Sequence, residues 1–243
     1  MRALKVVLAV NPYLGGPETT HSTVRCWADD SWQVLRAALP CDAPSVEHDV
    51  LLTRDAAVAL GLPRHLPFVK ELLDVAALQG SHWIGVANAD LAFEPPFFEW
   101  FAASQQEAEA IAIHRRDVDH TGQVAERVQW GSMDACLVRR AVWLRYRESL
   151  PDYIFGAPAW DMGWKAWCLG SEDEFPVKTV EYAEEGVLHR THTGAWRKHQ
   201  DEEGVHNRVL YARQMSELVR RGFTEGLHIP RAHFTQCIKE RGR

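Results

Sequence analysis

The chain of 243 residues is long enough for one α/β domain or two small ones, and it can bury roughly 70% or more of the surface that its unfolded form exposes. Its net charge of −6 argues against a protein whose whole surface binds nucleic acid, and the apolar run near its start is too short for a signal peptide or a membrane span. Five widely spaced cysteines without a C-x-x-C pair favour reduced thiols over a disulfide framework. These features predict a soluble, cytoplasmic protein.

The first half of the chain alternates between expected strands and helices. Residues 6–10 form a continuous apolar run ended by Asn11-Pro12, which is typical of a central strand in a parallel sheet. Apolar residues in 66–78 recur at helical spacing, and Gly80 ends this helix. The expected elements, in chain order, are a strand at 6–10, a helix at 22–39, a strand at 46–53, a helix at 66–78, a strand at 83–87, a helix after Pro95-Pro96 and a strand at 108–113. This alternation predicts βαβ units with helices on both faces of a sheet.

The alternation loosens beyond residue 116. The later expected elements are a Trp-rich helix at 160–169, strands at 177–181 and 186–189, and a last helix at 201–221. There is no internal repeat and no convincing linker, so we expect one compact domain over 1–200 with a helical extension, 201–243, packed on it. Residues 205–243 carry eight Lys or Arg and three Glu, which fits either a contact with a polyanionic acceptor or the solvated face of an amphipathic helix.

Asn88 and Asp90 are the first candidate site residues, because they follow the expected strand at 83–87. Ligands of open α/β sheets bind beyond the carboxyl ends of the strands, and side chains two apart on a strand point the same way. A carboxylate at this place can coordinate a hard divalent cation, which can neutralise a diphosphate. The alternative is a turn in which both side chains cap the local backbone.

Asp161 is the second candidate, at the start of the expected helix 160–169. Three tryptophans of this helix fall on one stripe that predicts a core face, namely Trp160, Trp164 and Trp167. Asp161 lies off that stripe, so it could face a cleft. The alternative is a purely local role, because Asp is favoured at the start of a helix.

His189 and His192 are the third candidate, directly after an expected strand. Two histidines three residues apart can bind one metal ion if the chain turns suitably. The alternative is a pair of surface or core histidines. No further Cys or His lies at zinc-site spacing nearby, so a zinc hydrolase of the H-E-x-x-H type is unsupported.

The order of these motifs gives a resemblance that none of them gives alone. The segments LPFVKELLDVAALQGSHWIGVANADLAF, GSMDACLVRRAVW, PDYIFGAPAWDMGWKAWCL and VLHRTHTGAW resemble nucleotide-sugar glycosyltransferases of the GT-A fold. In particular they are similar to a group of bacterial, phage and plant glycosyltransferase-like proteins with a succession of N-x-D, G-x-D, G-x-P-x-W-D and H-x-x-H motifs. The resemblance covers roughly residues 4–196 and implies a GT-A-like (Rossmann-like) α/β fold, with a mixed, mainly parallel sheet in a single domain.

The resemblance also implies roles for individual residues. Asn88 and Asp90 stand where the family has its D-x-D contacts to metal and ribose; the Asn departs from that pattern, which weakens a metal contact at Asn88 but not at Asp90. Asp161 matches the general base of inverting members. His192, or else His189, matches a late metal ligand. The remaining implied contacts are Asn11 and Tyr13 at the nucleotide base, Lys70 at the donor, and Gly131 and Asp134 on the sugar and acceptor side.

The implied activity is transfer of a sugar, such as a hexose, from a UDP-sugar to a hydroxyl acceptor with inversion, using Mn²⁺ or Mg²⁺. The acceptor is open: a saccharide, a lipid-linked saccharide, or a hydroxymethylated base in DNA reached through the basic C-terminal stretch. A nucleotidyltransferase that makes sugar nucleotides would normally carry a basic, Gly-rich loop after the first strand, whereas NPYLGGPETTH contains no Lys or Arg. The other alternative is a non-catalytic sugar-nucleotide binding protein, which Asn88 would favour.

Overall fold

The computed structural model describes residues 5–12, 19–28, 30–119, 121–126, 133–170, 177–190 and 202–222. The strands are β1 (Val6–Val10), β2 (Trp32–Ala38), β3 (Val50–Leu51), β4 (Trp83–Ala87), β5 (Leu91–Phe93), β6 (Ala110–His114), β7 (Arg116–Val118), β8 (Met133–Arg139), β9 (Thr179–Tyr182) and β10 (Val187–Arg190). The helices are α1 (Thr19–Trp27), α2 (Ala56–Leu60), α3 (Val69–Ala77), α4 (Pro95–Ser104), α5 (Arg140–Tyr146), α6 (Trp160–Gly170) and α7 (Glu202–Arg220), with a 3-10 turn η1 at Arg147–Ser149.

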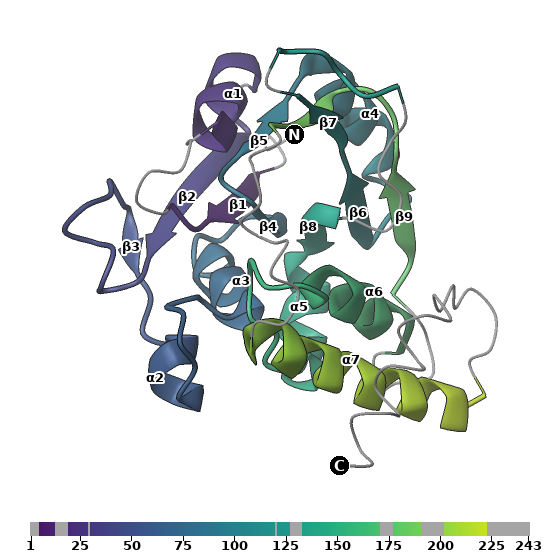
Figure 1. Cartoon of the computed structure of the whole chain (residues 1–243). Helices are drawn as coiled ribbons and strands as arrows, with labels where there is room; N and C mark the ends of the chain where they lie inside the picture. Colours follow the sequence, from purple (N-terminus) through teal and green to yellow (C-terminus); the bar gives the residue numbers. More distant parts are fainter. Residues whose placement is uncertain are drawn as a thin grey trace.

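A seven-stranded sheet forms the middle layer of the domain, in the order β3-β2-β1-β4-β8-β6-β9. Neighbouring strands are parallel except where β8 pairs antiparallel with β4 and with β6. The carboxyl ends of all the other strands therefore meet at one edge, together with the start of β8. Helices α3, α5, α6 and α7 cover one face of the sheet, and α1 and α4 cover the other (Figure 1). The predicted fold class, a mixed and mainly parallel α/β sheet in a single domain, is confirmed.

The strands are apolar on both faces because both faces are covered. In β1, Val7 and Ala9 belong to one hydrophobic cluster, and Val6, Leu8 and Val10 belong to the other. All five side chains are at most 3% exposed. Burial of both alternating sets accounts for the unbroken apolar run that the sequence shows at this strand.

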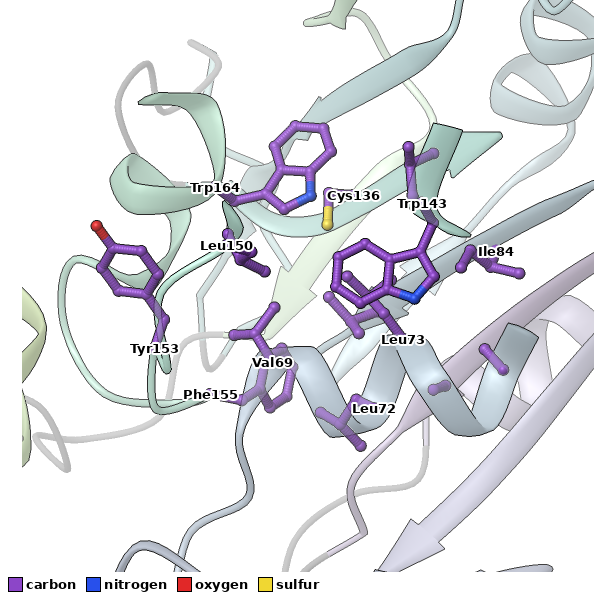
Figure 2. Packing of buried hydrophobic residues seen from close by; sticks show 14 of the residues in the cluster. Val69, Leu72, Leu73, Ile84, Cys136, Trp143, Leu150, Tyr153, Phe155 and Trp164 are labelled. Carbon is purple, nitrogen blue, oxygen red and sulfur yellow. The ribbon is translucent and has the colours of Figure 1, made fainter. Parts of the chain in front are cut away.

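The larger cluster lies between the sheet and α3, α5 and α6. Figure 2 shows Trp143 and Trp164 on either side of Cys136, above the apolar residues of α3. The expected tryptophan stripe of 160–169 is thus confirmed as a core face, since Trp164 and Trp167 are almost fully buried. Helix α7 packs on α6 through Met215 and Leu218.

The prediction of a single helix at 22–39 is wrong. The structure instead has α1 at Thr19–Trp27 and then strand β2 at Trp32–Ala38, which runs parallel to β1 with Val6 opposite Trp32. Pairing with β1 overrides the local helical pattern. The expected strand at 46–53 is reduced to β3, at Val50–Leu51, because only these residues pair with β2.

Several short elements were not expected from the sequence, namely α2, β5, β7, α5 and η1. Three of the short strands form a second sheet in the order β5-β10-β7. In this sheet β10 is antiparallel to β5 and parallel to β7. Among the described residues, no helix is both long and apolar enough to cross a membrane.

Candidate active site at the carboxyl edge of the sheet

The point where the strand order reverses lies between β1 and β4. From β1 the chain adds β2 and β3 on one side, and it then returns to place β4 on the other side of β1 (Figure 1). Asn11 directly follows β1, and Asn88 and Asp90 follow β4. Ligands of open α/β sheets bind in the crevice beyond the strand ends at such a point. The topology therefore brings these predicted site residues to one edge.

The segment after β4 is a turn, and helix α1 holds it. The Thr20 hydroxyl lies 2.7 Å from the carbonyl oxygen of Asn88 and 2.9 Å from that of Leu91, and the Thr20 amide donates to the carbonyl of Ala89 over 3.1 Å. Asn88 and Asp90 thus stand in a turn beyond the strand end. The expectation that strand alternation makes them point the same way does not apply to them. Asp90 is 5% exposed.

His189 lies between two carboxylates. Its Nε2 is 3.2 Å from Oδ2 of Asp90, and its Nδ1 is 3.1 Å from Oδ1 of Asp117. The small sheet creates this arrangement, because β10 pairs His189 with Leu91 of β5 on one side and with Asp117 of β7 on the other. The structure thus brings His189, the second choice for the late metal ligand, into contact with Asp90 from within β10.

Two further charged residues extend this contact into a chain in which Asp90, His189 and Arg115 are buried and the other two carboxylates are partly buried. Nε of Arg115 donates to Oδ1 of Asp117 over 3.0 Å, and the Arg115 guanidinium also contacts the Asp134 carboxylate at the start of β8. We call Asp90, His189, Asp117, Arg115 and Asp134 the buried charge chain. It connects the ends of β4, β6 and β10 with the starts of β7 and β8 at one sheet edge.

The charges of this chain depend on one another. The hydrogen bond from His189 lowers the pKa of Asp117 and Arg115 lowers it further, while burial opposes them. Burial alone would lower the pKa of His189, but its hydrogen bonds with Asp117 and Asp90 outweigh burial and raise the pKa above its ordinary value. The carboxylates thus favour positive charge on or beside the imidazole.

Asp161 reaches the same edge from helix α6. It lies in the first turn of α6, and its Oδ2 accepts a hydrogen bond from the amide of Met133 over 3.2 Å, where β8 begins. Asn88 is one strand away, because its amide donates to the carbonyl of Asp134 over 2.9 Å. Burial raises the pKa of Asp161. A carboxyl group with a raised pKa, half-buried at a helix start, has the properties of a general base.

The backbone before Asp161 is strained. Ala159 has φ of 75°, the left-handed region that favours glycine. Such strain persists where surrounding structure enforces it, and it is frequent at functional sites.

A second group of charged side chains lies one helical turn after Asp161. Lys165 pairs with Glu181 over 2.9 Å, and the second oxygen of Glu181 lies 3.0 Å from Nε2 of the buried His114.

Sequence reasoning missed several of these residues. Arg115 and Asp117 were not singled out, although the charged run 114–117 directly after an apolar strand was a signal that could have found them. Lys165 and Glu181 carried no such signal, because they lie on two elements, α6 and β9, that only the tertiary fold brings together.

The other predicted site residues are distributed as follows. Asn11 joins the ends of β1 and β2, since its Nδ2 donates to the carbonyl of Ala37 over 2.9 Å. Lys70, in the first turn of α3, places its ammonium 2.6 Å from Glu148. Tyr13, Gly131 and His192 lie outside the described residues.

The donor set at Asp90 and His189 fits a divalent cation. Two metal ligands at about 2.0–2.2 Å from one ion lie roughly 3 Å apart, which is close to the 3.2 Å between these two side-chain atoms. Metal-bound histidines commonly donate their other ring N–H to a carboxylate, as His189 can to Asp117. A carboxylate and an imidazole together suit Mn²⁺ better than Mg²⁺, which prefers oxygen ligands.

A cavity of about 140 Å³ lies at the opposite end of β4, lined by His82, Trp83 and Arg139 among others. Pockets for drug-sized ligands typically measure about 300–1,000 Å³, so this cavity is too small for a nucleoside diphosphate. It also lacks carboxylates. The candidate active site is therefore the carboxyl edge and not this cavity.

No family model matches the sequence, and neither does any curated protein. Among solved structures, residues 1–349 of TarS from S. aureus in complex with UDP align with 97% of this chain and 78% of the TarS chain, with a TM-score of 0.50 and 12% identity. TarS in complex with UDP-GlcNAc aligns with 93% of this chain and 77% of its own, at a TM-score of 0.49 and 10% identity. HddC from Yersinia pseudotuberculosis aligns with 76% of this chain and 93% of its own, at a TM-score of 0.40 and 11% identity. At such identities the similarity shows the fold alone.

Proposed function

We propose that this chain is a metal-dependent glycosyltransferase that moves a sugar from a UDP-sugar to a hydroxyl acceptor. The observation that carries the proposal is the buried contact of Asp90 with His189, over 3.2 Å, at the point where the strand order reverses. The similar fold of TarS, whose structure contains UDP, supports the choice of nucleotide.

Asp90 and His189 would hold the divalent cation, and His192 stays a predicted further ligand. When bound, such a cation supplies positive charge beside the leaving diphosphate. With the cation bound, the Nδ1–H of a neutral His189 would donate its hydrogen bond to Asp117, which would leave the Nε2 lone pair for the metal. Asn11 and Asn88 lie at this same edge of the sheet, where they would contact the nucleotide as predicted. Asp134, predicted on the sugar and acceptor side, is paired with Arg115.

Asp161 is the general base in this proposal. The acceptor oxygen forms a bond to the anomeric carbon while the bond from that carbon to the diphosphate oxygen breaks. Asp161 takes the proton of the acceptor hydroxyl, and UDP leaves with the bonding electrons. Attack on the side opposite the leaving group inverts the anomeric configuration. The raised pKa of Asp161 brings its basicity closer to that needed at neutral pH.

The experiment that tests this function measures UDP release from a panel of UDP-sugars, with Mn²⁺ or with a chelator, alone and with saccharide and hydroxymethylated DNA acceptors. We expect Mn²⁺-dependent release that one acceptor class accelerates. Metal-dependent binding of UDP-sugar without release would identify a non-catalytic binding protein. Formation of a nucleotide sugar from UTP and a sugar 1-phosphate would identify a nucleotidyltransferase. Either outcome would overturn the proposal.

A further inference from the structure

A second group of metal-ligand side chains lies at the same sheet edge, on its other flank. Cys41 follows β2, Asp55 precedes α2, and His65 follows α2. One ligand atom from each of them lies within 4.8 Å of the others. We call these three residues the exposed cluster, because Cys41 and His65 are exposed to solvent. The part of the molecule that carries it, around β2, β3 and α2, projects to one side of the domain (Figure 1).

The backbone fixes Asp55 and His65 relative to each other. The amide of Ala56 donates to the carbonyl of Leu66 over 2.9 Å, and Asp55 forms an isolated β-bridge with Pro67. Asp55 also caps α2, because its Oδ1 accepts from the amide of Ala57 over 2.9 Å. Its Oδ2 points to Nδ1 of His65, 2.5 Å away. Thus one carboxylate oxygen is used by the helix, and the other faces the cluster.

A separate turn brings Cys41 to the same place. The carbonyl oxygen of Leu39, at the end of β2, accepts from the amides of Asp42 and Ala43 over 3.0 Å each. Capping of α2 and the ion pair with His65 explain the position of Asp55 without any metal. They do not explain why a thiol from a different turn meets that pair.

The three side chains of the exposed cluster influence one another's ionisation. Although Cys41 is exposed overall, partial desolvation raises the pKa of its thiol, and the negative charges of Asp42 and Asp55 raise it further. The hydrogen bond to Asp55 raises the pKa of His65. Asp55 contributes to both shifts, so its carboxylate is the charge that the thiol and the imidazole share. A bound cation reverses such shifts, because it stabilises a thiolate and a neutral imidazole.

We propose that Cys41, Asp55 and His65 bind a transition-metal ion of the Zn²⁺ class. Thiolate, imidazole nitrogen and carboxylate oxygen are the three ligand types that zinc accepts, whereas Mg²⁺ and Ca²⁺ prefer oxygen alone. Binding releases the thiol proton of Cys41 and the proton held between His65 and Asp55, and the ion takes their place. Three protein ligands leave a fourth position for water or another small ligand. The ion would fasten the turn after β2 to the start of α2.

This site differs in chemistry from the one at Asp90 and does not rest on the proposed glycosyltransferase activity. Its donors include a thiolate, so it selects Zn²⁺ or Co²⁺ over Mn²⁺. The sequence does not indicate it, because the spacing 41, 55 and 65 matches no zinc-binding motif.

The test is a titration of tag-free, reduced apo-protein with Co²⁺ and then with Zn²⁺ in competition, without nucleotide. We expect one equivalent of Co²⁺ to give a thiolate-to-cobalt charge-transfer band, and Zn²⁺ to displace it. Cys41→Ser should abolish the band and weaken Zn²⁺ binding at least about 100-fold, and His65→Gln should weaken it by at least about 10-fold.

Cys26→Ser is the matched control, because Cys26 is also an exposed cysteine of the described chain but lies on α1. It should bind as wild type does. Equal affinity in wild type, Cys41→Ser and His65→Gln would mean adventitious surface binding only and would overturn the proposal. If circular dichroism shows that Cys41→Ser is unfolded, His65→Gln, altered at an exposed side chain, decides the outcome.

Discussion

The buried charge chain and the exposed cluster use similar side chains in opposite surroundings. Asp90 and His189 are each 5% exposed, and every ring nitrogen of His189 faces a carboxylate. In the exposed cluster the Asp55 carboxylate is 11% exposed, but the His65 side chain is 53% exposed. Burial strengthens electrostatic coupling, whereas solvent screens it. We therefore expect substitutions in the buried chain to affect distant partners, and substitutions in the exposed cluster to act locally.

Asp161→Asn should have the largest effect, a loss of about 100- to 10,000-fold in kcat, because the general base is removed. Affinity for the donor should stay near wild type. The variant should also unfold at a higher temperature at neutral and alkaline pH. Burial raises the folded-state pKa of Asp161, so the folded state binds more protons than the unfolded state between the two pKa values, and stability falls as pH rises through the folded-state pKa. Turnover, donor Kd and Tm across pH measure these effects.

Asp74→Asn is the matched control for this prediction. Burial also raises the pKa of Asp74, but its carboxylate accepts from Nε1 of Trp143, on the helical layer. Its substitution should leave kcat nearly unchanged. Equal losses of donor binding and turnover in Asp161→Asn would make Asp161 a structural residue at the start of α6. The assignment of Asp161 as the general base would then be wrong.

Asp117→Ala should have the next largest effect. It removes the carboxylate that orients His189 and leaves Arg115 paired with Asp134, so Mn²⁺ affinity should fall about 10- to 100-fold. Electron paramagnetic resonance of free Mn²⁺ measures this directly, without turnover. Asp49→Ala is the control, because it removes a carboxylate paired with Arg36 near the other flank of the sheet. If both variants lose the same Mn²⁺ affinity, the loss does not depend on the contact between Asp117 and His189, and the positioning role of Asp117 is wrong.

The sequence predicted those features that depend on local patterns. The unbroken apolar run of β1 indicated a strand buried on both faces, and the tryptophan spacing of α6 indicated its core face; both are confirmed. The strand β2 was mistaken for a helix because its apolar residues do not alternate strictly, and its state is set by pairing with β1. Local pattern alone does not contain that pairing.

The same division holds for the candidate site. Asp90 and His189 could be proposed because Asp90 follows one recognisable strand and His189 lies at the end of the strand expected at 186–189. The contact of His189 with Asp117 could not, because it arises from the small sheet in which three short strands from distant segments meet. The exposed cluster was even harder to predict from the sequence, since Cys41 and His65 come together only through turns around β3 and α2. The metal contact of His192 stays a prediction.

The most direct test of the central claim, that Asp90 and His189 form a metal-nucleotide site, is a calorimetric titration of UDP into wild type and Asp90→Asn, with Mn²⁺ and with a chelator. We expect Mn²⁺ to tighten UDP binding to wild type by at least about 10-fold and to have little effect on the variant. If Mn²⁺ strengthens UDP binding equally in both proteins, or in neither, Asp90 does not hold the metal and the proposed site is wrong.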